Sequence, residues 1–392
     1  MKKRVVLVAN SASMIDHFNR DNIRLLQEKG CDVTVAANFR EGNSSTDEKI
    51  ESFRRWLVEE DIDIVDLPIP RKPYQIGKAI RSTRLLADYM KEKPCVLMHC
   101  QTPFGGVCGR LAAKRFRKKQ GMKVIYFAHG FHFFKGASPK NYMIYYPIER
   151  HYARITDLLL TSNDEDFRAA QKFPCKDVRF VPGVGVDTDK IHDITADRTA
   201  LLVEQGIPKN AKLILVGAEL IPRKNVETAI RAFARMKDRN TFLLICGKGE
   251  MQEELRQLSL LEGVSERVRF LGYRTDLTSI MHMVDCLLFT SRQEGLSVVM
   301  LSAMAAGLPV VASDIRGNRD LLDHETGRSY LLPVEDADAY AEKLDALLAS
   351  PEEMKRQGEA NYRWIKERFD LSIVSSMMSE IYDGFLVKDQ SL

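Results

Sequence analysis

Glu294 and Gly295 combine a carboxylate with a flexible turn at a place that suits sugar and phosphate binding. They lie between an apolar run, Cys286 to Thr290, and a predicted short helix from about Ser297 to Ala306. A carboxylate accepts hydrogen bonds from hydroxyl groups, and the free amide groups of a helix N-terminus suit a phosphate. Ser297 can equally serve only as the N-cap of that helix. In open α/β sheets ligands bind beyond the carboxyl ends of the strands, so this turn predicts a sugar-nucleotide site.

A second group of cations is expected at the same sheet edge. Arg223 and Lys224 follow a predicted strand, Lys212 to Gly217, and Gly247 and Lys248 follow the next one. Two adjacent cations fixed at this edge can stabilise a diphosphate leaving group electrostatically. Taken alone, Arg223 and Lys224 are also compatible with a solvated helix start. The second loop on the same edge favours the binding interpretation.

His129 is the candidate in the first half of the chain. It directly follows a predicted strand, Lys123 to Ala128, and precedes Gly130. A histidine at such a strand end can hydrogen-bond, relay a proton or carry charge near pH 7. A purely structural role is the alternative.

The elements that position these residues alternate between apolar strands and amphipathic helices in both halves of the chain. This alternation predicts parallel, doubly wound sheets, and 392 residues are too many for one core. We expect an N-terminal Rossmann-like domain over residues 1–182 and a C-terminal one over residues 190–368, facing each other across a cleft. A final helix, within residues 371–392, is expected to join the first domain. Near the N-terminus, Ser11 to Met14 is predicted as a loop and His17 to Lys29 as one helix.

Positive charge is concentrated in residues 71–150. This segment has 17 Lys and Arg residues against three acidic ones, whereas the whole chain has 58 and 54. Such a patch attracts anionic partners, and its aromatic residues do not interleave with the cations as nucleic-acid binding would favour. We expect a patch for an anionic membrane surface, with a solvated basic face as the alternative. Its predicted cations are Lys78, Arg81, Arg84, Lys114, Arg115, Arg117, Lys118 and Lys119.

Metal and cofactor motifs are missing from the sequence. It contains no H-E-x-x-H, Cys/His cluster, P-loop or G-x-G-x-x-G that opens a helix. Two D-x-D pairs, Asp61/Asp63 and Asp187/Asp189, lack the surrounding pattern of a metal clamp. We therefore expect neither a metal nor a cofactor.

Cysteine usage and hydropathy predict the compartment. Seven cysteines, an odd number without a C-x-x-C, indicate a reducing cytoplasm. No apolar run reaches 18 residues, and the apolar run near the N-terminus is too short for a signal peptide. We expect a cytoplasmic protein without a membrane span.

Five segments together resemble the retaining glycosyltransferases of family four, which have the GT-B fold of two facing Rossmann-like domains. The segments are FAHGFHFFKG around His129, the linker VPGVGVD, ELIPRKN with Arg223 and Lys224, LGYRTDL, and EGLSVVMLSAMAAGLPVVASDIRGNRDLL. The sequence around His129 and the following YYPIER further resemble the bacterial capsule and exopolysaccharide subgroup. The resemblance covers nearly the whole chain.

The resemblance implies a metal-independent hexosyltransferase. It would move a sugar from a nucleotide diphosphate, expected to be a UDP-sugar, to a lipid-linked acceptor at the inner face of the plasma membrane. Arg223 and Lys224 would hold the diphosphate, while Glu294 and His129 would orient the sugar. The further implied contacts are Gly247, Lys248, Gly295, Leu296 and Ser297 for the donor, Tyr273 and Arg274 for the base, and Ser11, Ser13 and Met14 as an acceptor-side loop.

Ser302 departs from the family pattern. The family has two glutamates with seven residues between them, and the second position here is a serine. In the family the second carboxylate accepts hydrogen bonds from the ribose. Losing such a charge-assisted hydrogen bond costs about 1.5–3 kcal/mol. Two alternatives follow: a non-catalytic or weakened GT-B partner in a polysaccharide assembly complex, and a GT-B sugar-nucleotide epimerase.

Overall fold

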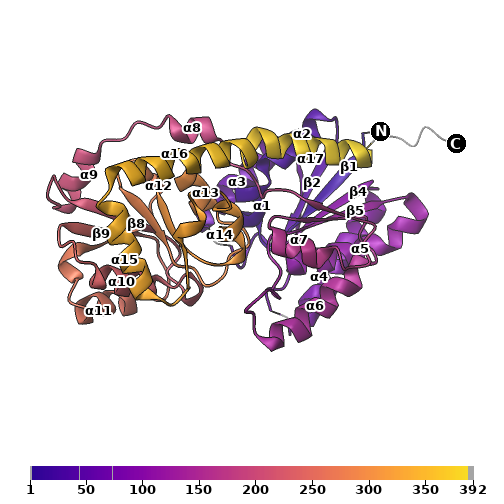
Figure 1. The fold of residues 1–392 in the computed structure, drawn as a ribbon. Coiled ribbons are helices and arrows are strands. Elements are labelled where there is room, and N and C mark those ends of the chain that lie inside the picture. Colours follow the sequence, from indigo (N-terminus) through magenta and orange to yellow (C-terminus); the bar gives the residue numbers. More distant parts are fainter. Residues whose placement is uncertain (1, 44, 73, 387–392) are drawn as a thin grey trace. The chain divides into compact units, whose positions relative to one another are not determined.

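The chain folds into two α/β units in a computed structural model that describes residues 2–43, 45–72 and 74–386 (Figure 1). The first unit comprises the chain up to Val184 together with the segment from Ile373 onward, and the second comprises Gly185–Ser372. The predicted linker is therefore divided between the units. A β-bridge between Val186 and Asp370 places the two crossing points of the chain side by side.

The first unit contains a parallel seven-stranded sheet in the order β3-β2-β1-β4-β5-β6-β7. Its strands are β1 (Arg4–Val8), β2 (Asp32–Ala37), β3 (Asp63–Asp66), β4 (Leu97–Gln101), β5 (Lys123–Ala128), β6 (Leu158–Thr161) and β7 (Asp177–Phe180). The order reverses between β1 and β4, which is the switch point where ligands bind in such sheets. The predicted strand Lys123 to Ala128 coincides with β5.

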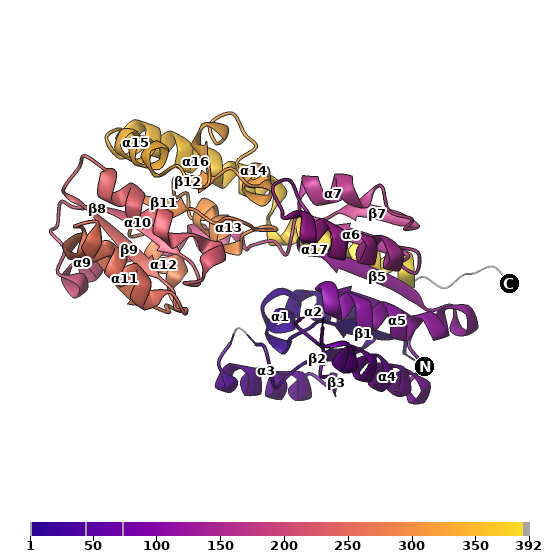
Figure 2. The ribbon, with the colours of Figure 1, turned by 90° about the horizontal axis from the view of Figure 1, so that it is seen from below.

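Helices cover both faces of this sheet. They are α1 (Ala12–Phe18), α2 (Arg20–Glu28), α3 (Asp47–Glu59), α4 (Ile76–Glu92), α5 (Pro103–Gln120), α6 (Pro139–Ala153), α7 (Asp164–Ala170) and α17 (Leu371–Leu386). Alternate residues of β1 contact opposite cores: Val5 and Leu7 pack with α1, α2, α3 and α17, whereas Val6 and Val8 pack with α4, α5 and α6. Figure 2 shows these helices as a ribbon. Strands buried on both faces read as continuous apolar runs, which is how the sequence indicated them.

The segment after β1 corrects one prediction. Ser11 to Met14 is not a loop, because Ser11 is the N-cap residue of α1 and the helix begins at Ala12. The small polar run was compatible with a turn, but serine is also a preferred N-cap and alanine favours helix. The predicted single helix over His17–Lys29 is also wrong, because Asn19 separates α1 from α2.

The second unit has a parallel six-stranded sheet in the order β10-β9-β8-β11-β12-β13. Its strands are β8 (Lys212–Gly217), β9 (Thr241–Cys246), β10 (Val268–Gly272), β11 (Cys286–Phe289), β12 (Val310–Ser313) and β13 (Leu331–Leu332). Its helices are α8 (Thr188–His192), α9 (Arg198–Gln205), α10 (Val226–Arg235), α11 (Gln252–Leu261), α12 (Leu277–Met281), α13 (Val298–Ala305), α14 (Arg316–Leu321), α15 (Ala337–Leu348) and α16 (Pro351–Arg368). Its switch point lies between β8 and β11.

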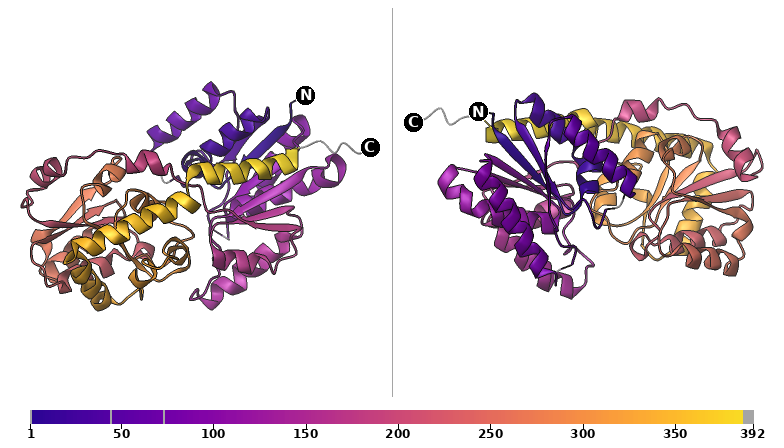
Figure 3. Two further views of the ribbon diagram at one scale, coloured as in Figure 1. Left: turned by 45° about the horizontal axis from the view of Figure 1, so that its top comes forward. Right: turned by 180° about the vertical axis from the view of Figure 1, so that it is seen from behind.

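Helix α17 returns the end of the chain to the first unit (Figure 3). Val374, Met378, Ile381 and Tyr382 are buried in the same core as α1 to α3. These positions recur every three or four residues, so one face of the helix is apolar. The first unit is therefore completed by residues distant in sequence.

Candidate active site

Glu294 binds two cations at the switch point of the second unit. Its Oε1 lies 2.6 Å from Lys224 Nζ and 3.2 Å from Arg223 Nη1. Glu294 and Lys224 are largely buried, with side chains 11% and 15% exposed, whereas the Arg223 side chain is 42% exposed. The three charges sum to one positive charge, so the cluster attracts an anion.

The second carboxylate oxygen of Glu294 remains available. Oε2 accepts no hydrogen bond from any residue that the structure describes. The carboxylate is thus oriented by the two cations through one oxygen and can accept a hydroxyl hydrogen bond through the other. Arg223 also donates to the carbonyl oxygen of Gln293 at 3.0 Å.

Asn225 connects the two loops that carry these charges. Arg223 and Lys224 lie in a 3₁₀ turn, Pro222–Lys224, before α10 rather than in the helix itself. Asn225 follows in the left-handed conformation, with φ at 53°. Its side-chain nitrogen Nδ2 donates to the backbone carbonyl oxygen of Thr290 at 3.1 Å. The hydroxyl of Thr290 donates in return to the backbone carbonyl oxygen of Asn225 at 2.8 Å. These bonds join the β8 loop to the β11 loop.

Arg316 and Gly317 support the Glu294 turn from α14, and our sequence reasoning did not single them out. Arg316 is buried, and its Nε donates to the carbonyl oxygen of Glu294 at 3.0 Å. A Cβ atom at Gly317 would lie 2.1 Å from the carbonyl oxygen of Gly295. Only glycine permits this approach. The available signal was the R-G pair directly after an apolar strand.

The segment after Glu294 leads into α13. Ser297 is the N-cap, and its hydroxyl accepts from the amide of Met300 at 3.3 Å. The capping role considered as an alternative is therefore present. Leu296 and Gly295 form the turn before it, and the first amides of α13 have no partner within the helix. Ser302 lies just over one turn into α13 and is 8% exposed.

Gly247 and Lys248 form a loop that packs tightly against the loop after β8. A Cβ atom at Gly247 would lie 1.7 Å from the carbonyl oxygen of Ala218, and the amide of Leu220 donates to the Lys248 carbonyl at 2.9 Å. The Lys248 side chain is exposed. The predicted proximity of the two loops is confirmed by these contacts.

Tyr273 and Arg274 follow β10 at the same sheet edge. The Tyr273 side chain is 58% exposed. Arg274 forms a two-pronged ion pair with Asp276, at 2.7 and 2.8 Å, and contacts Glu204 at 3.3 Å. These bonds raise the pKa of Arg274 and fix the guanidinium in place. The roles of both residues toward a base stay predictions.

In the first unit, His129 lies at the carboxyl end of β5 and belongs to a chain of hydrogen bonds. Its Nε2 bonds to Oε1 of Gln101, and its ring stacks on Phe127 with centroids 4.4 Å apart. Gln101 Nε2 donates to Asn19 Oδ1 at 2.9 Å and to His99 Nε2 at 3.0 Å. The amide of Gln101 is therefore fully engaged.

This network determines the state of His129. An amide oxygen only accepts, so His129 Nε2 carries the proton and Nδ1 is left as an acceptor. Burial lowers the pKa of His129 to about 4, which makes the ring neutral at pH 7. His129 can thus accept a hydroxyl hydrogen bond, while Gln101 acts as its positioning residue.

The other predicted positions of the first unit are placed differently from expectation. Ser11, Ser13 and Met14 belong to the N-cap and first turn of α1, where the two serine hydroxyls lie 3.2 Å apart. Arg117 pairs with the buried Asp157 and does not contribute to an exposed patch. Lys78 pairs with Glu41 at 2.6 Å. The remaining predicted cations are exposed: Arg81, Arg84, Lys114, Arg115, Lys118 and Lys119.

The described ranges contain neither a cluster of metal ligands nor a membrane-spanning helix. Within them, no three His, Cys, Asp or Glu side chains gather closely enough to hold a metal ion. Asp63 and Asp189, from the two D-x-D pairs, bind lysines Lys93 and Lys366 at 2.6 Å. None of the described helices combines the length and apolar character needed to cross a membrane. A metal-free reaction stays a prediction.

Comparison with known proteins identifies the family. The model described as "Glycosyltransferase Family 4" matches residues 17–190, and the one described as "Glycosyl transferases group 1" matches residues 197–364. The chain is 30% identical over 395 residues to "Putative glycosyltransferase EpsD" of Bacillus subtilis (strain 168), covering 99% of this chain and 98% of that protein.

Two further proteins extend the comparison. The chain is 24% identical to the UDP-Gal:alpha-D-GlcNAc-diphosphoundecaprenol alpha-1,3-galactosyltransferase of Escherichia coli, over 85% of this chain and 84% of that enzyme. It also matches the crystal structure of HepE from Anabaena in complex with UDP and glucose, with a TM-score of 0.77, 19% identity, and 98% and 100% of the two chains covered. Together with the two Rossmann-like units, these matches show that the chain belongs to the family 4 glycosyltransferases of GT-B fold.

Proposed function

We propose that this glycosyltransferase moves a hexose from a UDP-sugar to a lipid-linked acceptor in cell-surface polysaccharide synthesis. The transfer would retain the anomeric configuration, use no metal ion and take place at the inner face of the plasma membrane. The names of two similar proteins support the donor and the acceptor. HepE was crystallised with UDP, and the Escherichia coli enzyme is named for a UDP-sugar donor and a diphosphoundecaprenol-linked acceptor.

The observation that carries the proposal is the Arg223–Glu294–Lys224 cluster at the switch point of the second unit. When the bond between the sugar and the diphosphate breaks, negative charge grows on the leaving phosphate. Arg223 and Lys224 would stabilise that charge as fixed cations. Oε2 of Glu294 would accept a hydroxyl of the sugar, and the turn at Gly295 to Ser297 would approach the phosphate.

The proposed chemistry assigns no carboxylate as nucleophile. The acceptor hydroxyl would attack the anomeric carbon on the face that the diphosphate leaves, and the departing phosphate would take the acceptor proton. His129 would contribute a neutral acceptor at Nδ1 toward the transferred sugar. The donor would also be contacted by Lys248, Tyr273, Arg274 and Ser302. The acceptor would lie near Ser13 and Met14.

Replacement of Arg223 by alanine tests the leaving-group role. We expect kcat/KM for sugar transfer to fall by about a hundredfold or more, because one fixed charge at the developing anion is lost. Arg235→Ala is the matched control, since Arg235 is a surface cation of the same unit that pairs with Asp338 at 3.1 Å. Transfer would be followed by release of UDP. Wild-type rates in Arg223→Ala would exclude the assigned role.

The serine at position 302, where the family has a glutamate, favours a second candidate function. That candidate is a non-catalytic partner in an assembly complex. A calorimetric titration with UDP separates the two functions. Saturable binding below millimolar concentration supports the transferase. No binding at millimolar concentration favours the partner.

A further inference from the structure

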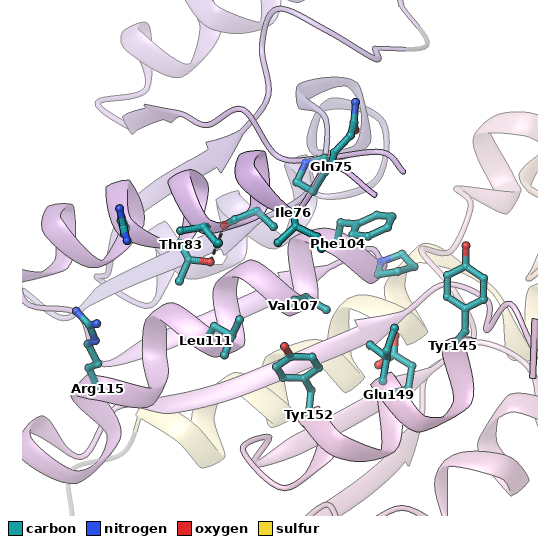
Figure 4. Close-up of a pocket in the computed structure, with 16 residues that line it drawn as sticks. Gln75, Ile76, Thr83, Phe104, Val107, Leu111, Arg115, Tyr145, Glu149 and Tyr152 are labelled. Carbon is teal, nitrogen blue, oxygen red and sulfur yellow. Dashed lines mark hydrogen bonds between the residues drawn. The ribbon is translucent and has the colours of Figure 1, made fainter. Parts of the chain in front are cut away.

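Helices α4, α5 and α6 of the first unit enclose a groove of about 420 Å³ whose lining does not include His129 or the residues of its hydrogen-bond network (Figure 4). Its volume lies within the range of small-molecule sites. Most of the lining is apolar, including Ile76 and Ile80 of α4, Val107 and Leu111 of α5, and Ile148 of α6. The groove therefore suits an apolar occupant.

Two polar side chains of the groove, Glu149 and Thr83, already have hydrogen-bond partners within the protein. The carboxylate of Glu149 accepts from Arg110 at 3.0 Å and from the Tyr126 hydroxyl at 2.8 Å, and Arg110 is 1% exposed. The Thr83 hydroxyl donates to the carbonyl oxygen of Ala79 at 2.9 Å. Neither of these two groups requires a polar ligand.

Cations lie at one end of the groove. Arg84 and Arg115 line it. Both lie close enough to Asp88 to interact with it electrostatically, but the ion pair of Asp88 is formed with Lys91. Figure 4 shows Arg115 at the opposite end of the groove from Gln75 and Tyr145. An occupant with an apolar chain and an anionic head would match this distribution of charge.

Apolar side chains are also exposed around the groove. Ile76 is 65% exposed, Ile80 48% and Ile148 36%, and all three line the groove. Scattered exposed apolar residues are ordinary, but a group of them around one groove marks an interaction surface. Because Arg84 and Arg115 lie on the same helices as these side chains, the surface fits the boundary between lipid head groups and acyl chains.

We propose that the α4–α6 groove binds one acyl chain of an anionic membrane phospholipid, with Arg84 and Arg115 on its phosphate. A second copy of the chain fits less well, because a symmetric contact would bring two positive faces together. The lipid-linked acceptor also fits less well. From Phe104 to Arg115 the groove follows α5 for about 16 Å, away from the sheet edge that carries His129. An acceptor would need its phosphates at the Phe104 end.

The probe is a single-chain anionic lipid, lauroyl lysophosphatidylglycerol, below its critical micelle concentration. Isothermal calorimetry with the full chain should show saturable binding. Lauroyl lysophosphatidylcholine, with the same chain and no net charge, should bind at least tenfold more weakly, and glycerol phosphate should not bind. Equal binding of glycerol phosphate would show a phosphate site rather than a chain groove.

Val107→Trp fills the groove without changing charge and should abolish binding of the probe. Val203→Trp, at an exposed position of α9, is the control for adding a tryptophan. Thermal melting of both variants shows whether they fold. Unchanged binding in a folded Val107→Trp variant would overturn the proposal; if that variant does not fold, the charge variants decide.

Two double variants, which change the net charge of the protein by the same amount, locate the head group of the lipid. Arg84→Glu with Arg115→Glu should weaken binding at least tenfold, whereas Lys72→Glu with Lys78→Glu, at the other end, should leave it within about twofold. The opposite result would place the head at the sheet edge and assign the groove to the acceptor. Transfer to a soluble acceptor is a separate readout, so the lipid site and the proposed reaction fail independently.

Discussion

Ser302 stands where the family pattern has the second of two glutamates, and the first of them is Glu294 in this chain. It lies on α13, which begins just after the Glu294 turn, and its side chain is 8% exposed. A serine hydroxyl is shorter than a carboxylate and carries no charge, so it binds ribose hydroxyls less strongly. The expected consequence is weak nucleotide affinity in a site that keeps the two cations proposed to bind the diphosphate, Arg223 and Lys224.

Ser302→Glu should tighten UDP binding by about tenfold or more, since it restores a charge-assisted hydrogen bond. Ser302→Gln is the matched variant, with similar length and no charge, and should give a smaller gain. Calorimetry measures both affinities, and thermal melting checks that a carboxylate at this position is tolerated. An affinity that neither folded variant changes would remove the ribose from this position.

At the scale of elements, α14 holds the turn that presents Glu294. The helix contacts the turn through Arg316 and through the close approach of Gly317 to Gly295. A site built on such a contact tolerates little change in backbone position, because interiors are packed as densely as organic crystals. The geometry of Glu294 therefore depends on a helix that starts 22 residues later.

Gly317→Ala should displace the Glu294 turn and lower both stability and nucleotide binding. Overpacking of this kind costs about 1–3 kcal/mol. Gly384→Ala is the matched control, because a Cβ there meets no atom within 4 Å. Chemical denaturation and UDP titration give the two readouts. Wild-type UDP affinity in Gly317→Ala would show that the close contact does not set the turn.

Across the whole chain, a buried polar network joins elements from both ends of the sequence. Tyr382 of α17 bonds to His99 Nδ1 at 2.8 Å, and His99 connects through Gln101 to Asn19 and His129. Burial lowers the pKa of His99 to about 3, from about 6.5 in the unfolded chain. The end of the chain is thus tied to the residues beside the sheet edge by neutral groups.

The stability of the first unit should decrease as the pH falls below about 6.5. Between that value and about pH 4, the unfolded chain binds protons at His99 and His129 that the folded chain does not. Each histidine contributes a slope of about 1.4 kcal/mol per pH unit. His99→Gln should remove about half of this slope in urea unfolding, and His151→Gln, at an exposed position, should leave it unchanged. An unaltered slope in His99→Gln would contradict the assignment.

Local patterns of the sequence were sufficient for the two α/β halves, most strand positions and the loops that carry Arg223, Lys224, Glu294 and His129. Apolar runs report strands buried on both faces, and parallel strands necessarily bring their carboxyl ends to one edge. The error at Ser11 to Met14 arose because the same small polar residues serve both in turns and as helix caps. Because turns and helix N-caps use the same residue types, the local pattern did not distinguish a loop from a helix start.

Tertiary structure decided which charges meet. Lys224 and Glu294 are 70 residues apart, Arg117 and Asp157 are 40 apart, and neither pair has a local signal. It also decided that Gly317 supports the turn and that α4, α5 and α6 leave an apolar groove between them. Composition determines how much charge and apolar surface a segment has. Strand register and helix packing determine which of it is paired, buried or left open to a ligand.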